Sequence, residues 1–156
     1  MNHPVEILLV EDNPSDEELT LHVLSRHFAG RIADRVKIVR DGAEALEFLF
    51  STGAYAGRGP HQPPKMLLLD LKLPKIDGLE VLRRAKADPR TRAIPIVVFS
   101  SSYEKRDLRQ ARELGAHSYV VKPVDFGQFA EAVREALAAT NAMDHTIANA
   151  ATNEVT

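Results

Sequence analysis

The sequence predicts an α/β fold in which a five-stranded parallel sheet carries helices on both faces. Two observations predict this fold. Five short apolar segments alternate along the chain with five segments that show helical spacing or helix-start residues. Several of the apolar segments also run without a polar interruption, which is typical of strands buried on both faces. Because such alternation produces parallel sheets sandwiched between helices, we expect one doubly wound domain.

Length and composition limit the classes of protein to which the chain can belong. A chain of 156 residues is the size of one compact domain. The net charge of -2 provides no basic surface for nucleic acid, and the lack of cysteine excludes disulfides and thiolate chemistry. No apolar run has the length of a signal peptide or a membrane span. We therefore expect a cytoplasmic protein that contacts neither nucleic acid nor a membrane.

The first third of the chain is expected to form two strands and two helices. Residues 5–10 are an apolar strand, and residues 13–18 begin a helix with an Asx cap, a proline in the first turn and acids near the positive end of the helix dipole. A short strand is expected at 35–39. An Asp-Gly turn then caps a helix that extends to about residue 50.

The middle of the chain is expected to contain a loop, a buried strand and a third helix. Residues 53–65 hold several glycines and prolines and predict an irregular loop that is long for a helix-to-strand connection. The apolar run from Met66 ends at Asp70, and turn residues follow it. A helix over 78–87 is expected to stop at the Asp-Pro pair 88–89.

The last part of the chain is expected to add two strands, two helices and a tail. The expected elements are a strand at 94–99, a helix at 104–114 that ends at Gly115, a strand at 118–121 and a helix capped by Asp125 that runs to about 139. Residues 141–156 show no periodicity and predict a loosely ordered tail behind a domain of residues 1–140.

Polar side chains lie at the ends of four of the five expected strands. Glu11 and Asp12 follow the first strand, Asp70 the third, Ser100 the fourth and Lys122 the fifth. Ligands bind open parallel sheets at the carboxyl ends of the strands. We therefore expect these five side chains to converge at one edge of the sheet.

The chemistry of this group favours phosphoryl transfer. Three adjacent carboxylates repel one another, and a hard cation, Mg²⁺ or Mn²⁺, would neutralise them, with the backbone carbonyl of Lys72 as a further ligand. Lys122 suits one phosphoryl oxygen as a compact positive charge, and the Ser100 hydroxyl can donate to another. The group therefore indicates a carboxylate nucleophile, Asp70, between a metal ion and a cation.

Each of these residues also has a purely structural interpretation. The acids can cap helices or form turns, Ser100 can simply be a polar strand end, and Lys122 can be a solvated terminus. The six histidines are scattered singly and are interpreted as surface or core residues. Structural roles do not explain why all five residues fall at matching strand ends, and this coincidence favours the site.

The motifs that carry these residues resemble those of receiver domains of two-component response regulators. The resemblance covers about residues 5–139. Four motifs carry it in order: LVEDNP at 9–14, LDLKLPKIDG at 69–78, PIVVFSS at 95–101 and GAHSYVVKP at 115–123. It implies a flavodoxin-like fold with strand order 2-1-3-4-5. It also implies a switch that catalyses its own phosphorylation and dephosphorylation, rather than an enzyme acting on other substrates.

The resemblance also implies a role for each site residue. Asp70 matches the phosphoacceptor, and the expected donor is a phosphohistidine on a sensor histidine kinase. The other matches are Glu11 and Asp12 as the acidic metal pair, Ser100 as the switch hydroxyl, Lys122 as the lysine of the motif and Tyr119 as the aromatic residue that turns inward on activation. Threonine is more common than serine at position 100 in this family. Serine keeps the hydroxyl but lacks the methyl group.

Narrower expectations concern partners. The chain ends soon after its last expected helix, so it looks like a stand-alone receiver. Its 53–65 loop, together with the sequence at 41–49, looks like that of small regulators that partner bacterial phytochromes. We expect a homodimer through the fourth helix, fifth strand and fifth helix. Either the apolar stripe of the last helix is all core, or its edge at Phe126, Ala130 and Leu137 stays exposed and joins Tyr119 in that contact.

Three other classes are less compatible with the sequence. A haloacid-dehalogenase-type phosphatase needs a second aspartate two residues after its nucleophile, where this chain has Lys72. A nucleotide-binding module needs a glycine-rich phosphate loop after the first strand, and the sequence contains none. A degenerate receiver that serves only as a scaffold would not be expected to retain all five site residues.

Overall fold

Five parallel strands form one sheet in the order β2-β1-β3-β4-β5, as expected. The computed structural model describes residues 5–27, 34–58, 63–101, 104–122, 125 and 127–138. The strands are β1 (Ile7–Val10), β2 (Val36–Val39), β3 (Met66–Leu69), β4 (Ile96–Ser100) and β5 (Ser118–Val121). The helices are α1 (Pro14–His27), α2 (Gly42–Phe50), α3 (Gly78–Ala87), α4 (Lys105–Glu113) and a helical segment at 127–138, here called the last helix.

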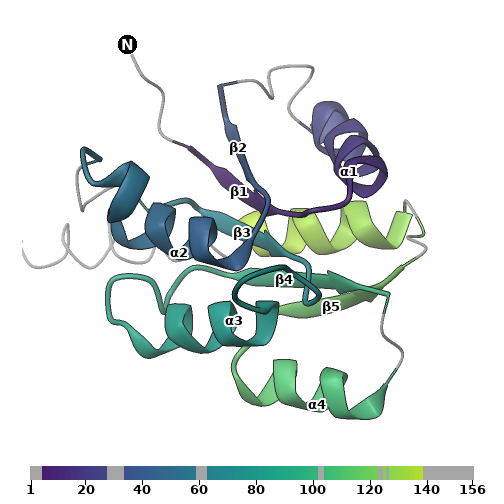
Figure 1. Cartoon of the computed structure of the whole chain (residues 1–156). Coiled ribbons are helices and arrows are strands. Elements are labelled where there is room, and N and C mark those ends of the chain that lie inside the picture. Colours follow the sequence, from purple (N-terminus) through teal and green to yellow (C-terminus); the bar gives the residue numbers. More distant parts are fainter. Residues whose placement is uncertain are drawn as a thin grey trace, which may run out of the picture.

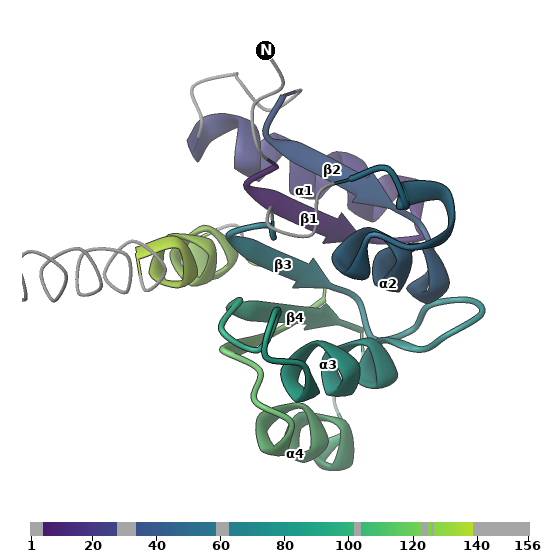
Figure 2. The same cartoon turned by 90° about the vertical axis from the view of Figure 1, so that its left-hand side faces the viewer.

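Helices cover both faces of the sheet (Figures 1 and 2). On one face α2, α3 and α4 pack over strand residues such as Leu8, Leu67 and Val98. On the other face α1 and the last helix pack over Ile7, Leu68 and their neighbours. Because successive side chains of a strand point to opposite faces, β1 and β3 are buried on both sides, which explains their uninterrupted apolar runs.

Most element boundaries agree with the sequence to within two residues. Asn13 caps α1 by accepting from the backbone N–H groups of Ser15 and Asp16, and Asp125 caps the last helix in the same way at Gln128. Strand β4 starts two residues later than expected. Pro95 has no N–H to donate to a neighbouring strand, so the hydrogen-bonded strand begins at Ile96.

The first residues of the loop expected at 53–65 are more regular than the sequence indicates. Residues Gly53–Tyr55 form a short 3₁₀ helix, η1, and the Tyr55 ring packs edge-on against Phe48 of α2 with centroids 5.1 Å apart. The guanidinium carbon of Arg58 lies over the Phe48 ring, 3.5 Å from its centroid. Stacking of aromatic and cationic groups therefore holds the first part of the loop against α2.

The apolar stripe of the last helix belongs to the core where the structure describes it. Val133 and Leu137 are buried, and Ala130 packs against the same cluster. The expectation of an exposed edge is therefore wrong for Leu137, because the helix needs this residue to cover the sheet. Phe126 and the tail 141–156 lie outside the described residues. Tyr119 packs against the core of the opposite face, so it does not extend an edge that contains Leu137.

Within the described residues, no helix combines the length and the apolar character that crossing a membrane requires.

Candidate functional site

The register of the sheet brings the expected site residues to one edge. Val10 of β1 pairs with Leu69 of β3, so Glu11 and Asp70 leave their strands at the same level. A hydrogen bond of 3.1 Å from the Asp70 N–H to the Val10 carbonyl oxygen fixes this alignment. On the other side, Ser100 ends β4 opposite Val121. The residue after Val121 is Lys122, so its backbone also reaches this edge.

Three carboxylates gather at this edge. Oxygen atoms of Glu11, Asp12 and Asp70 all lie within 4.8 Å of one another. Glu11 and Asp70 are buried, whereas Asp12 is exposed, so the cluster opens to solvent on one side. Hard divalent cations such as Mg²⁺ and Mn²⁺ prefer carboxylate oxygens and retain water ligands. This donor set, with one open side, fits such a cation.

The ammonium group of Lys122 lies between the carboxylates. Its Nζ is 2.9 Å from Glu11 Oε2, 2.7 Å from Asp16 Oδ2 and 3.2 Å from Asp70 Oδ2. The Phe99 ring centroid lies 4.8 Å from the same atom. An ammonium group has three donors, so these three carboxylates can use its full capacity.

Burial and these contacts shift the pKa values of Glu11 and Lys122 in opposite directions. Burial raises the pKa of Glu11 to about 7, although the hydrogen bond from Lys122 opposes this shift, and the nearby charge of Asp70 adds to it. Burial alone would lower the pKa of Lys122. Its hydrogen bonds to Asp16 and Glu11 outweigh burial, so the pKa of Lys122 lies above its ordinary value. Lys122 is therefore a permanent cation here.

Both carboxylate oxygens of Asp70 accept hydrogen bonds. The Lys72 N–H donates to Oδ1 over 3.1 Å, and Lys122 Nζ contacts Oδ2. Lys72 belongs to the loop between β3 and α3, and this loop passes close to two glycines. A Cβ atom on Gly78 would lie 2.3 Å from the Asp70 carbonyl oxygen, and one on Gly42 would lie 1.9 Å from the Ile76 carbonyl oxygen. Glycine at both positions therefore lets the loop approach α2 and the start of α3.

Ser100 and Tyr119 occupy the β4–β5 side of the site. Ser100 is fully buried, and its carbonyl oxygen accepts from the Lys122 backbone N–H at 2.8 Å. Tyr119 is half-buried and pairs with Val98, two residues before Ser100. Ser100 is thus directly joined to Lys122 through the backbone, whereas Tyr119 lies farther back along the strands.

Sequence reasoning missed Asp16, the third carboxylate on Lys122. The sequence indicates it only as an acid favoured by the dipole of α1, which is a correct but incomplete description. The signal that could have found it is its position: the first turn of a helix that directly follows β1 lies beside the carboxyl ends of the strands.

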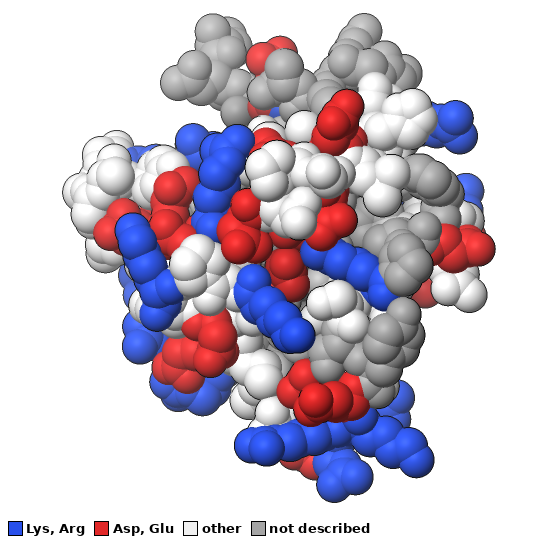
Figure 3. Space-filling model, turned by 45° about the vertical axis from the view of Figure 1, so that its right-hand side comes forward, with Lys and Arg blue, Asp and Glu red and all other residues white. Residues whose placement is uncertain are grey.

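The charge distribution supports this location of the site. Figure 3 turns toward the viewer the side on which the strand arrows of Figure 1 end, and Asp and Glu side chains gather near its centre with Lys and Arg beside them.

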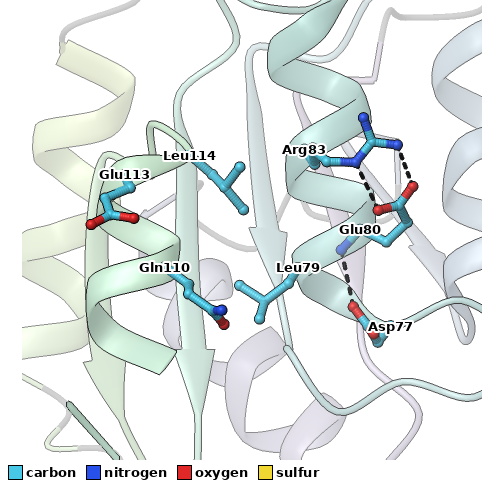
Figure 4. Close-up of a pocket in the computed structure, with 7 residues that line it drawn as sticks. All are labelled: Asp77, Leu79, Glu80, Arg83, Gln110, Glu113 and Leu114. Atoms are coloured by element: carbon cyan, nitrogen blue, oxygen red, sulfur yellow. Dashed lines mark hydrogen bonds and ion pairs between the residues drawn. The ribbon is translucent and has the colours of Figure 1, made fainter. Parts of the chain in front are cut away.

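A separate groove of about 400 Å³ lies between α3 and α4, where Leu79, Gln110 and Leu114 face one another (Figure 4). The groove is also lined by Asp77, Glu80 and Glu113, but within the described residues only Glu11, Asp12 and Asp70 bring three carboxylates within 4.8 Å of one another.

Known proteins resemble the chain over most of its length. The model of the response regulator receiver domain matches residues 7–134. A probable methanogenesis regulatory protein of Methanothrix harundinacea, FilR2, is 42% identical over 133 residues, which are 85% of this chain and 81% of the relative. Response regulator Rcp1 of Synechocystis is 40% identical over 121 residues, 78% of each chain.

Solved structures agree with this match. The bacteriophytochrome response regulator AtBRR is 48% identical, with a TM-score of 0.71 over 86% of this chain and 93% of its own. The Mn²⁺-bound form of Rcp1 is 35% identical, with a TM-score of 0.70 over 85% of this chain and 91% of its own. With the strand order, the acidic cluster and the lysine in place, this chain belongs to the family of response regulator receiver domains.

Proposed function

We propose that the chain is a single-domain response regulator that accepts a phosphoryl group on Asp70 from a sensor histidine kinase. The observation that carries this proposal is the arrangement around Asp70: a buried carboxylate at the end of a central strand, beside two further acids and the ammonium of Lys122. Phosphoryl transfer requires positioning of the nucleophile and neutralisation of oxygen charge, and this arrangement can provide both.

Glu11, Asp12 and Asp70 would hold the divalent cation, with the backbone carbonyl of Lys72 as a further ligand. Mg²⁺ or Mn²⁺ supplies positive charge to the phosphoryl oxygens when bound. The donor set supports this assignment, and so does the relative Rcp1, which has been solved in a Mn²⁺-bound form. Exposure of Asp12 supports entry of the cation from the open side of the cluster.

In the proposed reaction, an oxygen of Asp70 forms a bond to phosphorus while the P–N bond of the donor phosphohistidine breaks. The electron pair of that bond returns to the imidazole of the donor. Lys122 neutralises one phosphoryl oxygen, and the hydroxyl of Ser100 donates to another. Attack of water on the same phosphorus would return Asp70 to a carboxylate, so the chain would catalyse both formation and loss of its phosphoryl group.

We propose that the signal leaves through α4, β5 and the last helix, with Ser100 and Tyr119 as the switch residues. The weak anchoring of α4 supports this proposal, because Ala111 is the only buried residue among its nine described residues. A helix held by so little apolar area can shift at low cost in free energy. The position of Ser100 beside Lys122 supports a link from the phosphoryl group to this region.

The same face is proposed to form a homodimer. The exposed side chains of α4 are mostly basic, including Lys105, Arg109 and Arg112. The last helix exposes Glu131, Arg134 and Glu135, and Arg134 pairs with Glu131, which leaves Glu135 as an acid without a pairing cation among the described residues of that helix. In a two-fold dimer the basic helix of one protomer can face the acidic side chains of the other. The similarity to AtBRR, a bacteriophytochrome response regulator, supports a bacterial phytochrome as the kinase, with the exchange expected in the cytoplasm.

Incubation with acetyl phosphate and Mg²⁺ tests the phosphoacceptor. Intact-mass spectrometry should show one added phosphoryl group, and peptide mapping should locate it at Asp70. Asp70→Asn should remove it, because the amide keeps the shape of the side chain but is not a nucleophile. Asp88→Asn is the matched control, since Asp88 pairs with Arg90 away from the site.

The proposal fails if the Asp70→Asn protein gains the phosphoryl group at the wild-type rate. Removal of acetyl phosphate then tests the second half of the cycle. The added mass should decay faster with the native protein than after denaturation, because only the folded site can position water and the charged groups for hydrolysis.

A further inference from the structure

Asp16 makes the shortest of the three contacts to Lys122 but has no place in the acidic cluster. Its Oδ2 lies 2.7 Å from Lys122 Nζ, compared with 2.9 Å for Glu11 and 3.2 Å for Asp70. The cluster whose oxygens lie within 4.8 Å of one another consists of Glu11, Asp12 and Asp70. The other two carboxylates on Lys122 therefore have a second task, and Asp16 does not.

The backbone around Asp16 is fixed by contacts of its own. The Asp16 N–H donates to the Asn13 side chain in the cap of α1 at 3.1 Å. Its carbonyl oxygen accepts from the hydroxyl of Thr20, a buried residue, at 2.8 Å. The carboxylate is thus presented to the site from a rigid helical turn rather than from a loop, which favours a defined position.

The other two contacts of Lys122 must change during the reaction. Phosphorylation converts one oxygen of Asp70 into the bridging atom of an acyl phosphate, which removes the negative charge of that carboxylate. Glu11 shares its carboxylate with the proposed cation. Asp16 is joined neither to the phosphoryl group nor to the proposed cation, so its carboxylate can hold the ammonium in place as the phosphoryl group arrives.

From this geometry we infer that Asp16 is a positioning residue that orients the Lys122 ammonium toward the phosphoryl group on Asp70. The inference rests on the proposed function and deepens it. Asp16 is assigned no contact with the phosphoryl group or the cation, and its effect is exerted through Lys122. Loss of Asp16 should therefore slow phosphorylation without weakening binding of Mg²⁺.

The kinetic test uses the full chain with acetyl phosphate at saturating Mg²⁺. Asp16→Ala should lower the phosphorylation rate about two- to fivefold, because a contact whose carboxylate side chain is 33% exposed is screened by solvent. The affinity for Mg²⁺, measured by calorimetry, should stay within about twofold of wild type. Glu17→Gln is the matched control, since it removes an acid from the same helical turn that pairs with Arg40 instead.

A double-mutant cycle separates positioning from a general structural or electrostatic effect. If Asp16 acts through Lys122, adding Asp16→Ala to Lys122→Met should leave the slow rate of Lys122→Met unchanged. An equal fractional loss in both backgrounds would overturn the inference. So would a wild-type or faster rate for Asp16→Ala alone, or a loss equal to that of Glu17→Gln.

A second measurement does not depend on phosphorylation. The side chain of Lys122 is only 10% exposed, and Asp16 is the most exposed of the carboxylates that contact it. Acylation with acetic anhydride, followed by peptide mass spectrometry, should be faster at Lys122 in Asp16→Ala than in wild type, with exposed Lys72 as the internal reference.

The two measurements distinguish failure of the inference from failure of the proposed function. Absence of any phosphoryl group on wild type contradicts the proposed function, whereas the acylation result still reports on the Asp16–Lys122 contact. Equal acylation of Lys122 in Asp16→Ala and wild type contradicts the inference, whatever the phosphorylation experiment shows.

Discussion

Lys122 shows how one residue can serve two opposing tasks. Its ammonium neutralises the acids of the site, but it also occupies oxygens of Glu11 and Asp70 that the proposed cation would need. Two positive charges that share the same carboxylates compete with each other. The lysine therefore lets the acids lie together before a cation arrives and opposes that cation when it binds.

This competition leads to a prediction with two readouts for Lys122→Met. Mg²⁺ should bind more tightly than to wild type in calorimetry, because a competing charge is gone. Phosphorylation by acetyl phosphate should nevertheless slow about ten- to a hundredfold, since a charge-assisted contact to a phosphoryl oxygen contributes roughly 1.5–3 kcal/mol.

A second substitution, Lys122→Arg, separates charge from shape. It should not restore the rate, because a planar guanidinium does not fit between three carboxylates as a compact ammonium does. Weaker Mg²⁺ binding by Lys122→Met, or a normal phosphorylation rate in Lys122→Arg, would contradict these roles of the residue.

At the scale of elements, the start of α3 determines where the loop after Asp70 lies. Asp77 caps the helix by accepting from the Glu80 N–H at 3.0 Å, and the Gly78 N–H donates to the Leu71 carbonyl oxygen at 2.8 Å. The helix start is thus fastened to the end of β3. The loop that carries Lys72 is held between these two points.

Gly78→Ala should destabilise the fold by about 1–3 kcal/mol, which is the usual cost of forcing atoms into a packed region. The added Cβ would meet backbone atoms of Asp70 and Leu71 at 2.3 and 2.5 Å, so the loop or the helix has to move. Urea unfolding followed by circular dichroism measures the change in free energy of unfolding.

Gly57→Ala is the control for this substitution, because a Cβ at Gly57 would meet nothing within 4 Å. Its stability should remain within about 0.5 kcal/mol of wild type. If Gly78→Ala were as stable as Gly57→Ala, the close approach of α3 to Asp70 would not constrain the site.

At the scale of the whole molecule, the two faces of the sheet differ in how firmly their helices are held. The last helix buries Phe129, Val133 and Leu137 against one face, whereas α4 buries a single alanine against the other. The apolar area that helices bury decides how much free energy a displacement costs. A change that begins at the strand ends should therefore move α4 before it moves the last helix.

The proposed dimer involves the whole molecule and is tested by light scattering. Phosphorylated wild type should have a higher weight-average mass than the unphosphorylated protein at the same concentration. Arg109→Glu should reduce that mass, because it reverses a charge on an exposed position of α4 that would face acids of the second copy.

Glu18→Arg is the control, since it reverses an exposed charge on α1, outside the proposed contact. A wild type that stays monomeric at high concentration in both states would refute the dimer. An equal effect of the two charge reversals would indicate that net charge, rather than the α4 face, controls association.

The sequence by itself determined the strand order through its family motifs and the set of residues at the strand ends. These features are local or periodic: an apolar run that stops at Asp70, an Asx cap at Asn13, a glycine that ends α4. In a parallel sheet the carboxyl ends of the strands share one edge, so such local signals are enough to predict that Glu11, Asp70 and Lys122 meet.

Only the tertiary structure decided which partner each side chain takes. The pairing of Asp16 with Lys122 joins positions 106 residues apart. This pairing depends on the orientation of α1 relative to the carboxyl ends of the strands, which the spacing of apolar residues along the helix does not encode. The burial of Leu137 likewise depends on the rotation of the last helix about its axis, which decides which part of its apolar stripe faces the sheet. A stripe wide enough to cover a sheet fits several helix rotations, and packing against β4, β5 and α1 selects one of them.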